Sequence, residues 1–226
     1  MMFDLPFVIP SGKRDENGNV ICYVRLNGEV EYVKGIENYK IDLEKNNTII
    51  IYEGEAKPKR IVIGARRGNL LVLKRTKYSS KLLSISFKDN SKCYIGEDSS
   101  FVETFLHLRE GKNIFIGDDC QFSTGIYVWN SDAHSILDKD GKPVNYANDV
   151  YIGNHVWVCQ NSQILKGTHV ADNSVIGALS LVNKKFLEEN VIIAGNPAKI
   201  VKSGIGGWSR AAPSLYEKHK IRGNIL

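Results

Sequence analysis

The most regular hydrophobic pattern in the chain is a period of six residues between Ile152 and Val182. An aliphatic side chain returns at every sixth position, and a small or β-branched residue follows four positions later. A helix would repeat its apolar positions about every 3.6 residues, and a half-buried strand would alternate them in twos. A period of six is typical of short strands joined by corners, each strand sending one aliphatic side chain into a stacked interior. The pattern therefore predicts a parallel β-helix over this stretch, with inward residues at Ile152, Val158, Ile164, Val170, Ile176 and Val182.

The first quarter of the chain has a different pattern. Residues 1–60 fit no period of six and contain strand-like runs separated by polar turns, among them Asn27-Gly28, which is a strong hairpin signal. Because the terminal coils of a solenoid must be covered, we expect residues 1–60 to form an irregular β cap on its end. A small separate β-domain is the alternative.

The remaining boundaries follow from where the apolar rhythm starts and stops. We expect the solenoid over residues 61–202 and a tail over residues 203–226, with a short helix from Pro213 to Arg222. The rhythm disappears between Asn130 and Asp149, and we expect an excursion loop at 134–149. Insertions into a solenoid usually form its binding face, so this loop is the first place to look for function.

Composition narrows the class of protein. The chain has 226 residues, of which 42% are hydrophobic, enough for one domain with an appendage. We find no apolar run of membrane-helix length and no export signal at the N-terminus. The four cysteines show no paired spacing, which predicts reduced thiols in a cytoplasmic protein. The net charge of +5 suits an anionic ligand or simply a scatter of surface lysines. We expect no nucleic-acid partner and no membrane insertion.

Two further segments resemble the hexapeptide-repeat acyltransferases. Residues 177–184, GALSLVNK, are similar to the family's GAGSxVxK run, and residues 191–201, VIIAGNPAKIV, are similar to its closing signature VxAGNPAKxV. The resemblance implies a left-handed β-helix, a homotrimer with active sites between subunits, and transfer of an acyl group from coenzyme A to a hydroxyl or amine. The handedness is implied by the resemblance alone, since parallel strands otherwise favour right-handed crossovers.

Acyl transfer to a hydroxyl needs a base, and histidine is the side chain suited to that role near neutral pH. His134 stands at the start of the polar excursion, where residues 130–136, NSDAHSI, resemble the family's catalytic SDxHxI segment. We expect His134 to be the general base and Asp132 to hold its ring, with a backbone-capping role as the alternative for Asp132. His155 and His169 are expected to point outward without chemistry.

The resemblance also implies a site for acetyl-CoA as co-substrate. Trp157 matches the family's WxG segment, and we expect it as an aromatic wall within the catalytic set; a subunit contact is the alternative. Small residues would let backbone amides approach the pantetheine arm, and lysines would lie near the phosphates. The donor-binding residues expected are Trp157, Gln160, Ala178, Ser180, Asn183, Lys184, Lys199 and Lys202. We expect no metal, because no two histidines have the spacing of zinc-dependent solenoid enzymes.

Within the family, the segments around His134 and Trp157 look most like O-acetyltransferases of capsular and other surface polysaccharides, including sialic-acid polymers. We therefore predict an acetyl-CoA-dependent O-acetyltransferase acting on a sugar hydroxyl of a bacterial surface polysaccharide. Two alternatives remain: an N-acetyltransferase of a nucleotide-linked amino sugar, and a non-enzymatic binding solenoid. The first commonly carries an N-terminal βαβ unit, and residues 1–60 show no glycine-rich strand-to-helix turn.

Overall fold

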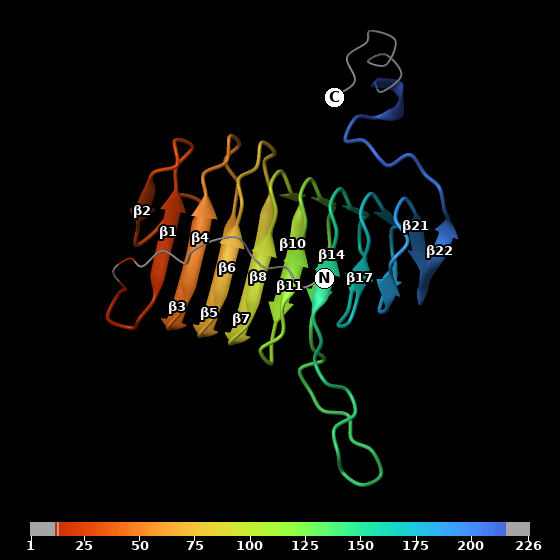
Figure 1. The fold of residues 1–226 in the computed structure, drawn as a ribbon, viewed down its shortest axis with the longest axis horizontal. Helices are drawn as coiled ribbons and strands as arrows, with labels where there is room; N and C mark the ends of the chain where they lie inside the picture. The colour runs from red at the N-terminus through yellow and green to blue at the C-terminus, as the bar shows by residue number, and fades with distance from the viewer. Residues whose placement is uncertain (1–11, 13, 216–226) are drawn as a thin grey trace.

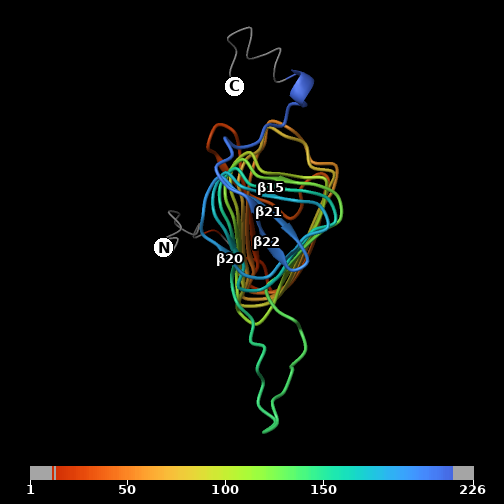
Figure 2. The ribbon, with the colours of Figure 1, turned by 90° about the vertical axis from the view of Figure 1, so that its right-hand side faces the viewer.

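Short parallel strands stack along one long axis and form three sheets in the computed structural model, which describes residue 12 and residues 14–215. The coils lie side by side from red β1 to blue β22 (Figure 1), and they superimpose when viewed end-on (Figure 2). The fold class expected from the sequence, a left-handed parallel β-helix, is confirmed.

The strands are named here by sheet, in spatial order. Sheet A contains β2 (Val30–Tyr32), β1 (Val20–Val24), β4 (Thr48–Tyr52), β6 (Leu70–Leu73), β8 (Lys92–Ile95), β11 (Ile114–Ile116), β14 (Val150–Ile152), β17 (His169–Val170) and β20 (Lys185–Phe186). Sheet B contains β19 (Leu181–Val182), β16 (Gln163–Ile164), β13 (Ile126–Trp129), β10 (Glu103–Leu108), β7 (Leu82–Asp89), β5 (Ile61–Arg67) and β3 (Tyr39–Lys45). Sheet C contains β22 (Ala198–Lys202), β21 (Ile192–Gly195), β18 (Val175–Ile176), β15 (Trp157–Val158), β12 (Gln121–Phe122) and β9 (Ser100–Phe101).

Regular stacking starts upstream of the predicted boundary at residue 61. Strand β1 pairs in parallel with β4, and β3 pairs in parallel with β5. The part of residues 1–60 that the structure describes therefore continues the solenoid, apart from the antiparallel β1–β2 hairpin at Asn27-Gly28. The period of six is missing there because equivalent positions lie 22 residues apart, as Asn47 and Asn69 do, whereas Asn154 and Asp172 lie 18 apart.

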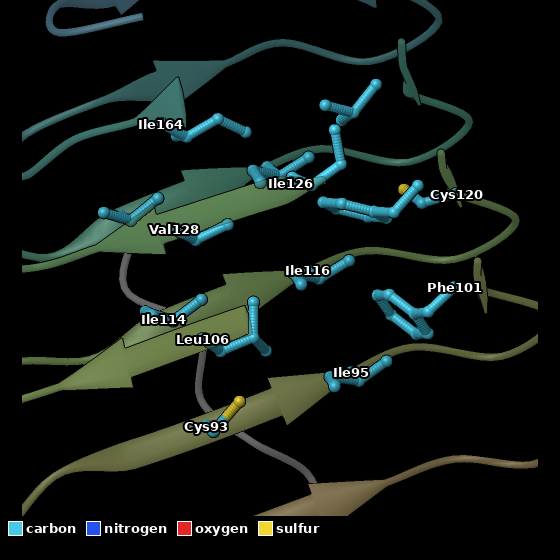
Figure 3. Close-up of a cluster of buried hydrophobic side chains, with 14 of the residues drawn as sticks. Cys93, Ile95, Phe101, Leu106, Ile114, Ile116, Cys120, Ile126, Val128 and Ile164 are labelled. Carbon is cyan, nitrogen blue, oxygen red and sulfur yellow. The ribbon is translucent and has the colours of Figure 1, made fainter. Parts of the chain in front are cut away.

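The interior is a continuous stack of apolar side chains. Inward residues such as Ile95, Ile116 and Val128 are fully buried, and they alternate with outward, less buried residues such as Phe115 and Tyr127. Figure 3 shows one section, in which Phe101 lies in the same layer as its aliphatic neighbours. The Phe101 and Phe122 rings stack with centroids 5.0 Å apart. Each coil thus buries its face only against the coil before and after it.

Two segments leave the stack. The first, which we call the arm, is residues 130–149; it projects below the coils in Figures 1 and 2. The second, which we call the strap, is residues 203–212; it follows β22 and returns over the coils before a helical turn at 213–215. The rest of the helix predicted to Arg222, like the N-terminal stretch examined for an export signal, lies outside the described residues.

Candidate active site

The arm is an ordered hairpin-like excursion between sheet B and sheet A. Its base is closed because the Asn148 amide donates to the Asn130 carbonyl at 3.0 Å. Further out, the Val144 amide donates to the Ile136 carbonyl at 2.9 Å. The backbone of the arm therefore supplies its own hydrogen bonds while its side chains remain exposed.

Two side chains that the sequence did not single out hold the base of the arm. Asn145 Nδ2 donates to Asp132 Oδ2 at 2.7 Å and to the His134 carbonyl at 2.9 Å. Lys166 Nζ donates to the same Asp132 oxygen at 2.5 Å and to the Asn145 carbonyl at 2.6 Å. Partial burial would raise the pKa of Asp132, but the hydrogen bonds from Lys166 and Asn145 outweigh it and lower that pKa.

His134 itself is exposed at this base. Its backbone is fixed through its carbonyl, while Asp132, which we expected to hold the imidazole, bonds to Lys166 and Asn145. Within the described residues, no hydrogen bond joins Asp132 to the His134 ring. The ring nitrogens are therefore accessible from solvent, and the ring-holding role predicted for Asp132 is not formed within this chain.

Trp157 lies on β15, on the outer face of sheet C, where it is half-buried. Its indole Nε1 donates to Ser123 Oγ at 3.4 Å. The ring of Trp208, from the strap, lies 6.0 Å away in a tilted arrangement. One side of the expected aromatic wall is therefore packed against the strap.

His155, which we expected to point outward without a role, holds the strap in place. Its Nδ1 lies 2.7 Å from Asp119 Oδ2, and its Nε2 lies 3.0 Å from the Trp208 carbonyl. Trp208 returns a bond from its indole N–H to the His155 carbonyl at 2.7 Å, and the two rings stack at 4.6 Å. Both ring nitrogens face acceptors, so only a ring protonated on both nitrogens donates to both.

Arg210 fixes the far end of the strap. Its guanidinium donates to Ser100 Oγ at 2.8 Å, to Gln121 Oε1 at 3.0 Å and to Asp119 Oδ1 at 3.1 Å, and it lies 3.9 Å from the centroid of the Tyr78 ring. These partners lie about 90 residues or more away in sequence, so no local motif predicts the contacts.

The residues expected near the pantetheine arm separate into exposed and internal ones. Gln160 and Ala178 are exposed on successive coils at the corner between sheets C and B, where the Leu179 amide donates to the Gln160 carbonyl at 3.0 Å. Ser180 is only 2% exposed, and its hydroxyl donates to the Gly177 carbonyl at 2.6 Å. Ser180 therefore belongs to the internal corner of the solenoid and does not present its hydroxyl to a ligand.

The expected basic cluster is divided between two sides of the chain. Asn183 and Lys184 are exposed where sheet B turns into sheet A. Lys199 and Lys202 are exposed on β22, the last strand of sheet C.

His134 and Trp157 are likewise on different sides of one chain. The arm that carries His134 joins sheet B to sheet A, whereas Trp157 belongs to sheet C. A single subunit consequently displays the predicted catalytic residues without bringing them together. Among the residues that the structure describes, no group of three or more His, Cys, Asp or Glu side chains is placed to hold a metal ion.

No family model matches the chain. It is 43% identical over 106 residues to a polysialic acid O-acetyltransferase of Neisseria meningitidis, covering 46% of this chain and 49% of the relative. It is 33% identical over 121 residues to a polysialic acid O-acetyltransferase of Escherichia coli O1:K1, covering 53% of this chain and 39% of the relative. The solved structure of a polysialic acid O-acetyltransferase has a TM-score of 0.71 and 26% identity, over 92% of this chain and 96% of that one. The chain is therefore similar to polysialic acid O-acetyltransferases, in sequence over about half of its length and in fold over nearly all of it.

A second solved structure, of a polysialic-acid-specific acetyltransferase, has a TM-score of 0.68 and 27% identity, over 91% of this chain and 94% of that one. The sequence matches span less than half the length of the two curated relatives. Across the part of the chain that is described, no helix has the length and apolar character needed to cross a membrane.

Proposed function

We propose that the protein is an acetyl-CoA-dependent O-acetyltransferase that acts on a sugar hydroxyl of a bacterial surface or capsular polysaccharide. The observation that carries the proposal is His134, exposed on an ordered arm within a segment that resembles the family's SDxHxI motif. The similarity to polysialic acid O-acetyltransferases supports the reaction and the class of acceptor.

In this mechanism the His134 imidazole takes the proton of the acceptor hydroxyl as the hydroxyl oxygen attacks the thioester carbonyl. The tetrahedral intermediate then collapses, the carbon–sulfur bond breaks, and the coenzyme A thiolate leaves with the proton returned by the imidazolium. The O-acetyl ester and the free thiol are the products. Exposed backbone amides at the corners are the candidate donors for the oxyanion.

The chain also offers groups that fit the donor. Trp157 supplies an aromatic surface, the exposed corner at Gln160 and Ala178 combines an amide side chain with a small one, and Lys199 and Lys202 supply positive charge. We assign the pantetheine arm to that corner and the phosphates to the lysines. Lys184, on the other side of the chain, would serve a different subunit's site, together with Asn183.

We infer that the active form is a homotrimer with sites between subunits, because one chain separates His134 from Trp157. The arm also carries four exposed apolar side chains that a second copy would cover. They are Ile136, 59% exposed, Leu137, 56%, Val144, 57%, and Tyr146, 70%. Sedimentation should therefore give a trimer, which Tyr146→Asp weakens and Leu26→Asp, an equally apolar exposed site on the N-terminal hairpin, leaves intact. A stable and active monomer would contradict this inference.

The reaction itself is tested by release of free thiol from acetyl-CoA in the presence of a panel of acceptors. The panel holds sialylated and other acidic polysaccharides, neutral polysaccharides and nucleotide-linked amino sugars. We expect thiol release with a polysaccharide and an alkali-labile ester in the product. Release only with an amino sugar would overturn O-acetylation in favour of N-acetylation.

A further inference from the structure

We propose that a cavity in the N-terminal coils is a binding subsite for an uncharged pyranose residue. The cavity has a volume of about 290 Å³, near the lower end of the range of ligand pockets. It lies on the side of the solenoid where sheet C stops at β9, and loops from three successive coils form its rim. Its depth is apolar, formed by Ile61, Leu83 and Phe101 of the core.

Two tyrosine hydroxyls in the wall lack protein partners. Tyr23 and Tyr39 line the cavity, and within the described residues neither hydroxyl makes a hydrogen bond. Burial raises the pKa of both phenols, so both remain neutral donors over the physiological range. Both tyrosine side chains are partly buried in the wall, so each hydroxyl is held where it can donate to a ligand in the cavity.

Further hydrogen-bonding groups surround the same space. Thr76 and Ser80 line it from one loop and Ser99 from a second segment, and each hydroxyl also makes a hydrogen bond within the chain. The exposed Glu37 and Lys57 show that the cavity reaches the surface. Hydroxyl and carboxylate groups around an apolar floor match a sugar ring, which presents hydroxyls at its edge and C–H groups on its faces.

The charges of the wall favour a neutral ligand. Three cations and three carboxylates line the cavity, and each cation is already engaged. The partners are Glu31 and Glu53 for Arg25, Glu37 for Lys57, and the ring of Tyr52 for Lys74. Lys74 lies over a neutral ring, but the formal charges of the wall sum to zero, so an anionic sugar would lose its hydration beside three carboxylates without a net attraction. An uncharged hexose meets no such penalty.

The position of the cavity connects it with the proposed acceptor. Ser99 and Phe101 belong to its wall, and β9 lies two strands from β15, which carries Trp157. At ordinary strand spacing the two strands are about 10 Å apart on the same side of the solenoid. A polysaccharide chain bound by one neutral residue in the cavity would therefore extend along the side that carries Trp157. This last step rests on the proposed function, whereas binding of a free sugar does not.

The binding itself is measured without acetyl-CoA, by NMR titration of the full chain with methyl galactopyranoside, methyl glucopyranoside and N-acetylneuraminic acid. We expect saturable binding of a neutral hexoside and weaker or no binding of the acid. Tyr23→Phe with Tyr39→Phe should weaken hexoside binding about five- to thirtyfold, the usual effect of losing one or two hydrogen bonds. The matched control is Tyr32→Phe, which removes a phenol hydroxyl from a side chain that is 50% exposed and outside the cavity.

Three results would each overturn the subsite: no saturable hexoside binding, tighter binding of the acid, or unchanged binding in the double variant. The link to catalysis is tested by the kinetics of acetyl transfer to a polysaccharide. The double variant should raise KM for a hexose-containing polysaccharide and leave kcat unchanged. An unchanged KM would confine the site to free sugars and overturn that link. A chain without transferase activity that still binds hexosides would refute the proposed function and keep the subsite.

Discussion

The upstream and downstream coils of this solenoid stack in the same way but close their corners with different chemistry. Upstream, buried asparagines form a ladder in which each amide oxygen accepts from the next coil: Asn47 donates twice to Asn19 Oδ1, and Asn69 donates twice to Asn47 Oδ1. Downstream, buried hydroxyls do the equivalent work, as Ser162 Oγ donates to the Gly177 carbonyl and Thr168 Oγ1 to the Val182 carbonyl, both at 2.9 Å.

The comparison shows that two features specify the stack: inward apolar residues, and corners whose buried polar groups are hydrogen-bonded. The length of a coil can vary. The 22-residue coils have room for long loops on one side, and a cavity forms there. The 18-residue coils are shorter, and the catalytic residue proposed for the downstream part, His134, lies on an appendage, the arm.

The largest effect is expected from placing a carboxylate in the shared core. Ile164→Asp in a downstream coil and Leu83→Asp in an upstream coil both bury an unpaired charge, since both side chains are fully buried. Each should cost several kcal/mol and abolish soluble folded protein. Soluble yield and far-UV circular dichroism check the outcome. Folded protein from Leu83→Asp alone would show that the upstream coils are not part of one core.

The next effect concerns catalysis and should be confined to the downstream part. If His134 is the base, His134→Ala should lower kcat by about 10²–10⁴-fold, which corresponds to roughly 3–5 kcal/mol of transition-state stabilisation. Binding of acetyl-CoA should change little, because the interaction lost is made in the transition state. The control is His169→Ala, an outward residue of β17, which should keep the rate within a few-fold. A full-rate His134→Ala enzyme would remove the mechanism.

Much of the downstream part was predictable from the sequence, because each strand is short and its one inward residue returns every sixth position. The arm was predictable from its loss of apolar rhythm, whereas the catalytic role of His134 stays a prediction. The coils before residue 61 were missed, although a signal was present: Asn47, Asn69, Ser91 and Asn113 recur every 22 residues. A search restricted to six-residue periods does not see that spacing.

Contacts between distant segments could not be predicted from the sequence. Lys166 reaches the arm from a later coil, and Arg210 reaches residues that precede it by about 90 positions or more. Such side chains carry no periodicity, so only the stacking of coils brings them to their partners. His155 was misjudged for the same reason: its outward position is correct, but the strap covers it.

A smaller effect should separate the two kinds of corner. Asn47→Ala removes the acceptor of two bonds from Asn69 and one of the donors to Asn19 inside a fully buried ladder, so it should cost about 2–3 kcal/mol. Ser162→Ala removes a single hydroxyl bond and should cost about 1 kcal/mol. Urea unfolding of both variants gives the comparison. Equal losses would mean that the ladder adds nothing beyond one ordinary hydrogen bond.

The smallest effect is a pH dependence at the junction of the two regions. His107 on β10 stacks on Trp129 at 3.8 Å, its Nδ1 is buried without a hydrogen-bond partner, and burial followed by the nearby Arg109 lowers its pKa from 6.5. The unfolded chain therefore binds the proton first as the pH falls. The stability contributed by neutral His107 is complete above about pH 7.5, and it declines as the pH drops through 6.5 toward the lower folded-state pKa.

The variant His107→Phe keeps a ring against Trp129 and removes the titration. Its free energy of unfolding should therefore fall less between pH 7.5 and 5 than that of the wild type. Urea unfolding followed by tryptophan fluorescence measures the pH dependence of both proteins, and equal dependences would show that His107 does not contribute to the acid sensitivity of the solenoid.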